Sequence, residues 1–226
     1  MPVVAPTGYG TLRTGAPSAF TDPVRAASYE AWYAGPGRRP DRLETALLER
    51  LLEDLPGARL VLEIGSGTGH FGRFFVARGF QVIGIDLSLP MLLTSTPLGG
   101  PPAALADAHR LPCGDGSVDV SLLVATLAFV SDPAVVLAEA ARVARIGMVV
   151  GALNRLSRLG RRISHRTEEP WRSATPFSVA DLIHLAHGAL RGRKHVVRWR
   201  TTLWPLWPHP LPLPWGDFIG VSVRWA

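Results

Sequence analysis

The chain has 226 residues, of which 47% are hydrophobic and 19% charged, and it contains a single cysteine. This composition supplies enough apolar material for the core of one domain and is not typical of a disordered chain. One cysteine excludes a disulfide framework within the chain and any four-cysteine zinc or iron–sulfur site. The N-terminus lacks the pattern of a secretory signal, and we expect a cytoplasmic protein with no membrane span.

The net charge of +6 is unevenly distributed, with −4 in residues 1–140 and +10 in residues 141–226. This basic final third favours either a polyanion partner or an ordinary solvated basic face. Its densest part is an arginine cluster, which predicts either a clamp for an anionic substrate or RNA phosphates, or an exposed helix face. No aromatic residues interleave the cluster, which weakens the RNA interpretation. The cluster comprises Arg155, Arg158, Arg161, Arg162 and Arg166.

The N-terminal part reads as an arm followed by helices. Residues 1–25 are rich in Pro, Gly, Thr and Ala and predict a loose or partly ordered arm. Residues 26–34 predict a short amphipathic helix. Asp41, with Glu44 three positions later, predicts the capping box of a second helix, which a leucine stripe carries as far as Leu55. We therefore divide the chain into an N-terminal arm and cap helix, residues 1–40, and a main domain, residues 41–226.

Apolar strand-length segments and helical segments alternate over the next hundred residues, a pattern that predicts a doubly wound α/β sheet. The expected strands are 59–64, 81–85, 103–106, 118–125 and 147–153, and the expected helices are 71–78, one opening at Pro90, and 133–144.

The last third predicts one more helix, with Ser178 at its N-cap, and two strands over 195–203 and 218–225. Between these strands, residues 204–215 hold five prolines, which exclude a helix or a central strand there. This Trp/Pro segment is open to three interpretations: the wall of a hydrophobic acceptor pocket, a subunit contact, or packing across the last hairpin.

A glycine-rich turn follows the first buried strand, and two acids end the next two strands. Such a turn lets the backbone approach a nucleotide closely. The dinucleotide pattern G-x-G-x-x-G would need a glycine where His70 stands, so the spacing is instead E-x-G-x-G-x-G, beginning at Glu63. Asp86, 21 residues after Gly65, is placed to accept both ribose hydroxyls, and Asp107 to meet the exocyclic amine of a base.

At these residues the sequence resembles the class I S-adenosylmethionine (SAM)-dependent methyltransferases. Residues 61–69 (VLEIGSGTG) are similar to the family's first motif, 83–88 (IGIDLS) to its second-strand motif, and 106–112 (ADAHRLP) to its adenine-side segment. The usual Pro-Gly-Gly turn before the fifth strand is absent. Tyr29-Glu-Ala-Trp-Tyr33 resembles the N-terminal segment of the small-molecule branch that includes the ubiquinone and menaquinone biosynthesis methyltransferases.

The resemblance implies a Rossmann-like fold: a seven-stranded, mostly parallel sheet with helices on both faces and an antiparallel C-terminal hairpin. It implies SAM as cofactor, S-adenosylhomocysteine as product, and methyl transfer to a small organic acceptor at O, N or C by in-line displacement. Two alternatives remain open. One is an RNA methyltransferase that uses the basic final third, and the other is a SAM-binding module without catalysis.

The resemblance also implies the residues that contact the cofactor. The glycines of the loop and Glu63 would hold the methionine part, Asp86 the ribose, Asp107 and the backbone of Ala108 the adenine, and Tyr29 would close over the cofactor. The full predicted set is Tyr29, Glu63, Gly65, Ser66, Gly67, Thr68, Gly69, Asp86, Leu87, Met91, Asp107, Ala108, His109, Val124 and Thr126.

No catalytic residue is assigned, because methyl transfer from a sulfonium mainly requires alignment of the nucleophile and exclusion of water. His70 and His109 lie close enough in sequence to the predicted site to be considered as general bases. Residues 125–129 lack the Asn/Asp-Pro-Pro-Tyr/Phe motif of enzymes that methylate exocyclic amines of bases or glutamine. No metal is expected, since no histidine pair has ligand spacing with supporting carboxylates.

Overall fold

The computed structural model describes residues 18–203 and 207–225. Its helices are α1 (Ser18–Thr21), α2 (Pro23–Ala34), α3 (Arg38–Leu52), α4 (His70–Val76), α5 (Leu89–Ser95), α6 (Pro133–Val143), α7 (Arg158–Ile163) and α8 (Val179–Ala189), with short 3-10 turns η1 (Thr96–Leu98), η2 (Thr126–Phe129) and η3 (Trp171–Ser173). Its strands are β1 (Leu60–Ile64), β2 (Gln81–Asp86), β3 (Ala103–Leu105), β4 (Val118–Val124), β5 (Ala144–Leu153), β6 (His195–Leu203), β7 (Trp207–Leu211) and β8 (Phe218–Trp225).

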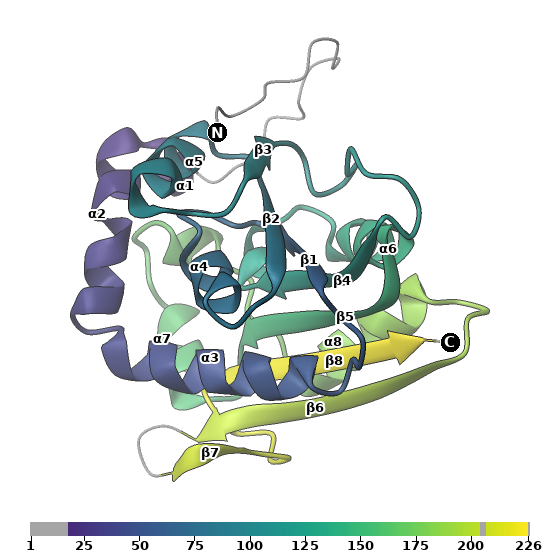
Figure 1. Cartoon of the computed structure of the whole chain (residues 1–226). Coiled ribbons are helices and arrows are strands. Elements are labelled where there is room, and N and C mark those ends of the chain that lie inside the picture. Colours follow the sequence, from purple (N-terminus) through teal and green to yellow (C-terminus); the bar gives the residue numbers. More distant parts are fainter. Residues whose placement is uncertain (1–17, 204–206, 226) are drawn as a thin grey trace.

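The strands form one mixed sheet in the order β3-β2-β1-β4-β5-β8-β6-β7 (Figure 1). The first five are parallel to one another, and β8, β6 and β7 join in antiparallel pairs. The predicted α/β class, the mostly parallel sheet and the antiparallel C-terminal part are thereby confirmed. The strand order reverses between β1 and β4, and ligands of such sheets bind beyond the carboxyl ends of the strands at that point.

The sheet has eight strands, one more than the seven we predicted. The additional strand, β7, comes from the proline-rich segment and pairs with β6 alone, at the edge of the sheet. An edge strand tolerates proline because one side of its backbone needs no partner in the sheet. The prolines therefore excluded a central strand, as expected, but they did not exclude an edge strand.

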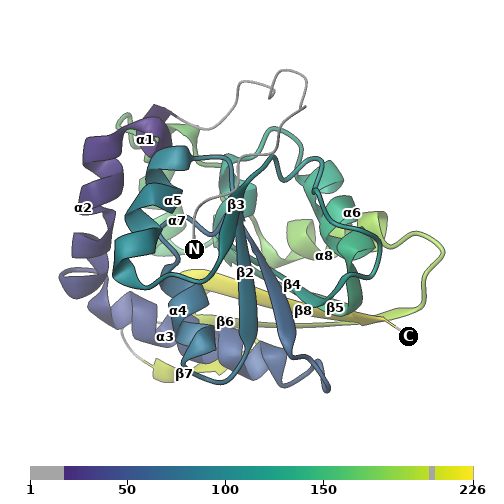
Figure 2. The ribbon, with the colours of Figure 1, turned by 45° about the horizontal axis from the view of Figure 1, so that its top comes forward.

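Helices cover both faces of the sheet. Figure 2 shows α3 and α4 on one side of the strands and α6 and α8 on the other. Each pair closes over its own cluster of buried apolar side chains, and the central strands contribute to both clusters through alternate residues. The leucine stripe predicted for α3 is confirmed, since Leu47, Leu48 and Leu51 are fully buried.

Helix starts follow local capping in two places and depart from our prediction in a third. Ser178 caps α8 and forms a capping box with Asp181, as predicted in position. Asp22 caps α2, which begins with Pro23. The capping box predicted at Asp41 is wrong. The turn after α2 already supplies Gly37 as N-cap of α3, and the Asp41 carboxylate bonds His70 instead.

The N-terminal segment is more regular than predicted. Residues 1–17 lie outside the described part of the chain, but residues 18–21 and those from Pro23 onward are helical rather than loose. The domain boundary predicted at residue 40 falls inside α3. Figure 1 shows α2 standing beside α5, at the end of the sheet where the glycine loop lies.

Within the described residues, no helix combines the length and apolar character needed to cross a membrane.

Candidate functional site

The loop that joins β1 to α4 has three glycines in left-handed backbone conformations. Gly65, Gly67 and Gly69 have φ values of 76°, 53° and 74°. A Cβ on Gly65 would lie 2.4 Å from Thr126 Oγ1, and one on Gly69 would lie 2.5 Å from Ser95 Oγ, whereas one on Gly67 would meet nothing within 4 Å. Gly65 and Gly69 are therefore required because the space behind them is already filled. At Gly67 the face of the loop is open to a ligand.

Short hydrogen bonds fix this loop against the neighbouring strands. The backbone N–H groups of Gly65 and Ser66 donate to Ile85 O at 2.7 and 3.0 Å. Thr126, two residues after the end of β4, donates from its hydroxyl to Ile64 O at 2.7 Å. The ends of β1, β2 and β4 thus form one rigid edge, with Val124 at the end of β4 almost completely buried.

Asp86 ends β2 and faces the glycine loop. Its Oδ2 accepts from Gly67 N at 2.7 Å, and its Oδ1 accepts from Ser88 N at 2.7 Å. Burial raises the pKa of Asp86, and these backbone donors oppose that shift. Each carboxylate oxygen keeps a second lone pair, so the group can accept hydroxyl donors without giving up the loop. Of its predicted neighbours, Leu87 is half-buried and Met91 is buried.

Asp107, two residues after β3, holds the side chain of His109. Its Oδ1 accepts from His109 N at 2.9 Å and lies 2.7 Å from His109 Nδ1. His109 Nε2 in turn accepts from Asp132 N at 3.3 Å and lies 3.1 Å from Ser131 Oγ. These contacts place the proton of a neutral ring on Nδ1. Asp107 Oδ2 makes no hydrogen bond with a described residue. Ala108, which lies between Asp107 and His109 in the chain, is half-buried.

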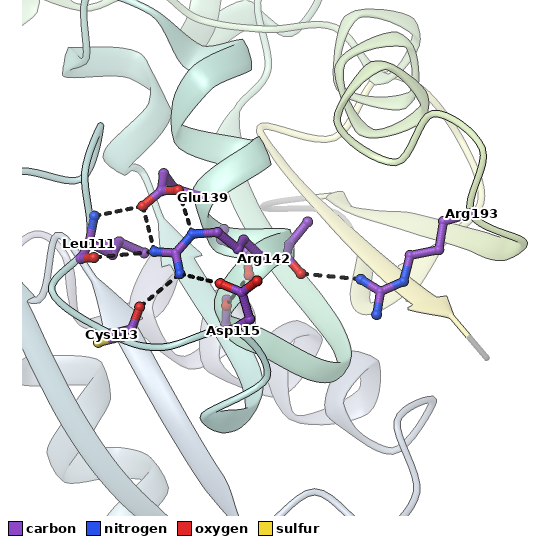
Figure 3. A network of polar contacts seen from close by, with 9 residues as sticks. Leu111, Cys113, Asp115, Glu139, Arg142 and Arg193 are labelled. Atoms are coloured by element: carbon purple, nitrogen blue, oxygen red, sulfur yellow. Dashed lines mark hydrogen bonds and ion pairs between the residues drawn. The ribbon is translucent and has the colours of Figure 1, made fainter.

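An arginine clamp secures the segment that follows Asp107 (Figure 3). Arg142 on α6 donates to the carbonyl oxygens of Cys113 and Leu111 at 2.8 and 3.2 Å and pairs with Asp115 at 2.7 Å. Glu139 accepts from Arg142 Nε and from Leu111 N, and the Arg142 guanidinium lowers the pKa of that carboxyl. Cys113 is therefore a free cysteine whose backbone serves as an anchor, with no chemical role in this network.

Glu63, in β1, is a buried carboxyl with an unmet hydrogen-bonding oxygen. Its side chain is 1% exposed, and Oε2 has no partner among the described residues. Burial, reinforced by the negative charge of Asp86, raises the pKa of Glu63 to about 8. A buried acceptor without a donor is costly, and a cation or N–H donor at the loop would remove that cost. The Ser66 hydroxyl is buried and unpartnered in the same way.

A polar network ties α2 to the glycine loop. Thr68, which is buried, donates from its hydroxyl to Glu30 Oε1. Arg73 on α4 donates to Thr68 O at 2.7 Å and to Glu30 Oε2 at 2.8 Å. Burial acts to raise the pKa of Glu30, but donors from His70, Thr68 and Arg73 outweigh it and lower the pKa to about 2. Helix α2 is thus attached to the loop through an ionised carboxylate.

His70, the first residue of α4, extends this network to α3. Its Nε2 lies 2.7 Å from Asp41 Oδ1, and Nδ1 lies 3.7 Å from Glu30 Oε2. The ring stacks on Tyr33 with centroids 3.5 Å apart and planes 7° apart. Burial acts to lower the pKa of His70, but the two carboxylates raise it to about 9. We call Glu30, Asp41, His70 and Arg73 the lid network.

Sequence reasoning missed most of the lid network. Glu30 lies inside the segment quoted for the resemblance, but only its neighbour Tyr29 was proposed as a contact. Tyr29 is 38% exposed, and its ring lies 5.8 Å from that of Tyr33 and 6.5 Å from that of Phe20. Glu44, expected in a capping box, lies within α3, where burial and then the charge of Asp41 raise its pKa to about 7. The sequence did offer one signal for this network: acidic residues in the segments that form α2 and α3, together with a histidine at the start of α4.

Together these groups suit the polar parts of SAM. The open face at Gly67 admits a ligand, Asp86 can accept ribose hydroxyls, Asp107 can accept an amine, and Glu63 lacks a donor. Thirteen of the fifteen predicted contacts lie on the loop, on β1 or at the ends of the next three strands, whereas Met91 lies on α5 and Tyr29 on α2. Among the described residues, no group of three His, Cys, Asp or Glu side chains could hold a metal ion.

The sequence is similar to known methyltransferases over its central part. A family profile described as a methyltransferase domain matches residues 62–150. A malonyl-[acyl-carrier protein] O-methyltransferase of Hamiltonella defensa is 34% identical over 118 residues, covering 49% of this chain and 45% of that protein. An uncharacterized methyltransferase of Mycobacterium tuberculosis is 34% identical over 151 residues, covering 66% and 60%. The chain thus spans about half the length of the curated relatives it matches.

Solved structures extend the similarity to nearly the whole chain. A SAM-dependent methyltransferase of Thermotoga maritima, described as a possible histamine N-methyltransferase, has a TM-score of 0.74 and 29% identity, covering 89% of this chain and 96% of that one. A SAM-dependent methyltransferase of Archaeoglobus fulgidus, at 16% identity and a TM-score of 0.63, supports the fold alone. The profile match, the glycine loop and these likenesses show a class I SAM-dependent methyltransferase domain in the central part of the chain, residues 62–150.

Proposed function

We propose that the protein transfers a methyl group from SAM to a small organic acceptor, at oxygen, nitrogen or carbon. The observation that carries this proposal is the edge formed by the glycine loop, Asp86 and the unpartnered Glu63, beneath a helical lid. The names of the relatives support a small acceptor group but differ in the acceptor atom, because one names an O-methyltransferase and another a possible N-methyltransferase. The acceptor atom therefore stays open in the proposal.

Within the family, we place the chain in the small-molecule branch that includes the ubiquinone and menaquinone methyltransferases. What supports this is the position of the segment Tyr29–Tyr33, which forms part of α2 and bonds the glycine loop through Glu30.

When bound, SAM supplies an already activated methyl group. The protein then has to hold the donor, orient the acceptor and exclude water. Asp86 would orient the ribose and Asp107 the adenine, and Glu63 would stabilise the ammonium end of the methionine part, directly or through water. The lid network would keep α2 closed over the loop while both ligands are in place.

Neither histidine considered from the sequence suits the role of general base. His70 has a pKa raised to about 9, so it is a cation at neutral pH and has no free lone pair to accept a proton. His109 uses its unprotonated nitrogen to accept from the backbone of Asp132. The acceptor would accordingly be a group that loses its own proton readily, or that needs to lose none before attack.

Incubation of the purified protein with SAM and a panel of small amines, phenols and carboxylic acids tests the proposal. The expected result is formation of S-adenosylhomocysteine that depends on one class of acceptor and disappears in an Asp86→Ala variant. Turnover with RNA alone would favour the RNA methyltransferase alternative. Tight binding of SAM without turnover on any acceptor class would favour the SAM-binding module.

A further inference from the structure

A cationic cavity lies along α7, apart from the residues predicted to bind the cofactor. The cavity has a volume of about 480 Å³, and the described side chains that line it are basic or imidazole groups. They are exposed and have the i, i+3, i+4, i+7 spacing that places residues on one face of a helix. The buried residues Gly160 and Ile163 occupy the opposite face of α7. The cationic face consists of Arg158, Arg161, Arg162 and His165.

The side chains of the cationic face have no partners among the described residues. Two arginines farther along the chain on either side are paired: Arg155 with Asp181 at 3.2 Å and Arg172 with Glu169 at 2.8 Å. By contrast, no side chain of the cationic face makes an ion pair or hydrogen bond with a residue in the ranges 18–203 and 207–225. Like charges three and four residues apart on a helix repel one another. The face therefore concentrates positive charge that only an external anion can neutralise.

Several contacts hold α7 at the edge of the sheet where acceptors would enter. Helix α7 begins soon after β5 ends, and its residue Leu159 donates from its backbone to Asp217 Oδ1, just before β8, at 3.4 Å. A Cβ on Gly160 would lie 1.9 Å from Asn154 O, so α7 packs tightly on the end of β5. The segment after α7 returns to η2, where Thr175 N donates to Ala128 O at 2.8 Å. Helix α7, which carries the cationic face, thus lies at the same edge of the sheet as Val124 and Thr126.

We propose that the cationic face binds an oxyanion, a phosphate or carboxylate group, carried by the methyl acceptor. This inference rests on the proposed function, because it assigns a chemical class to the acceptor of the proposed methyl transfer. A cavity of this volume is of the size that holds small ligands. Arginine guanidinium groups bind phosphate and carboxylate oxygens in bidentate pairs, and three of them within two turns can surround one such group.

A titration with simple oxyanions, monitored at His165, tests the proposal. Inorganic phosphate and malonate are added separately at fixed pH, with sodium chloride adjusted to keep the ionic strength constant. The ring resonances of His165 are followed by NMR and assigned with a His165→Gln variant. The expected result is saturable binding of at least one anion. Preference for phosphate assigns a phosphorylated acceptor, and preference for malonate assigns a carboxylate acceptor.

A matched pair of variants separates this site from general charge attraction. The cavity variant, Arg158→Gln/Arg161→Gln/Arg162→Gln, should weaken anion binding at least tenfold. The control variant, Arg191→Gln/Lys194→Gln/Arg224→Gln, removes the same charge from exposed positions elsewhere and should change binding less than twofold. The single variant Arg162→Gln, expected to weaken binding at least threefold, serves if the triple variant fails to fold.

Three results would overturn the proposal: no saturation of the wild type by either anion, equal losses in the cavity and control variants, or binding of a single-stranded RNA but of neither small anion. Calorimetry with SAM on the same proteins keeps the two proposals separate. A wild type that binds SAM but is saturated by neither anion contradicts the cavity assignment alone. Failure of SAM to bind the wild type contradicts the proposed function, whatever the anion titration shows.

Discussion

At the scale of single residues, the glycine loop combines two physical demands. Its backbone takes left-handed conformations that side chains disfavour, and the space behind Gly65 is already filled by Thr126. Glu63 and Asp86 then place two carboxyl groups at the same loop, and the negative charge of Asp86 raises the cost of ionising Glu63. The residue chemistry therefore favours a ligand that brings hydroxyl donors and a positive charge.

Substituting Gly65 by Ala tests the packing behind the loop. We expect a loss of about 2–4 kcal/mol in the free energy of unfolding, from the left-handed backbone and from the clash with Thr126. Gly57→Ala is the matched control, because Gly57 has a φ of 86° but nothing within 4 Å of the added Cβ. That control should lose only about 1 kcal/mol. Urea unfolding of both variants measures the difference, and equal losses would contradict the packing account.

From the raised pKa of Glu63 we predict that SAM binding releases a proton. With a pKa of about 8, the carboxyl is mostly protonated at pH 7 in the free protein. A nearby ammonium favours the ionised form, so binding should lower this pKa and release up to one proton. Calorimetric titration at pH 7 in phosphate and in Tris, buffers of different ionisation enthalpy, measures the release. A Glu63→Gln variant should show the same enthalpy in both buffers, and a wild type that did so would contradict this role.

At the scale of secondary-structure elements, the sequence predicted the alternating strands and helices well because their apolar periodicities are local properties. It predicted the Ser178 cap for the same reason. The capping box predicted at Asp41 failed because its carboxylate bonds a histidine on another helix instead of capping a helix. The sequence also failed to predict β7, because pairing at a sheet edge depends on β6 rather than on the prolines themselves. The lid network was missed because it joins α2, α3 and α4.

The lid network predicts a pH dependence of stability with a definite sign. His70 has a folded pKa raised to about 9, so its contribution is full below about pH 6.5 and is lost as the pH rises through 9. Thermal unfolding of the wild type should therefore lose about 1–2 kcal/mol between pH 6.5 and 9.5 that a His70→Gln variant does not lose. His184→Gln, at an exposed position on α8, is the control and should behave as the wild type. Parallel curves for the wild type and His70→Gln would refute the network's role.

At the scale of the whole molecule, the sheet and its two core clusters form the rigid part, and α2 forms a separate cover. Neither cluster includes a residue before Leu47, and within the described helix α2 only Ala26 is buried. The motifs sufficed to predict the edge that would bind the cofactor, because the carboxyl ends of β1, β2 and β4 meet there. The acceptor side could not be predicted, since α7 and the lid follow no motif and are positioned only by tertiary contacts.

Removal of residues 1–34 tests this division between core and cover. The truncated chain should keep its far-UV circular dichroism and unfold cooperatively, with a melting temperature lower by a few degrees, because both core clusters remain complete. Its affinity for SAM should fall about tenfold or more, because Glu30 and Tyr29 are lost from above the loop. A truncated chain that is unfolded, or one that binds SAM as tightly as the full chain, would contradict the division.

A calorimetric titration of SAM and S-adenosylhomocysteine into the wild type and Asp86→Ala tests the proposed cofactor site itself. Asp115→Ala is the matched control, since that carboxylate is 82% exposed and pairs with Arg142. We expect one site per chain, with affinity reduced at least tenfold by Asp86→Ala and unchanged by Asp115→Ala. Absence of binding by the wild type, or equal affinity in Asp86→Ala, would contradict a cofactor site built on the glycine loop and β2.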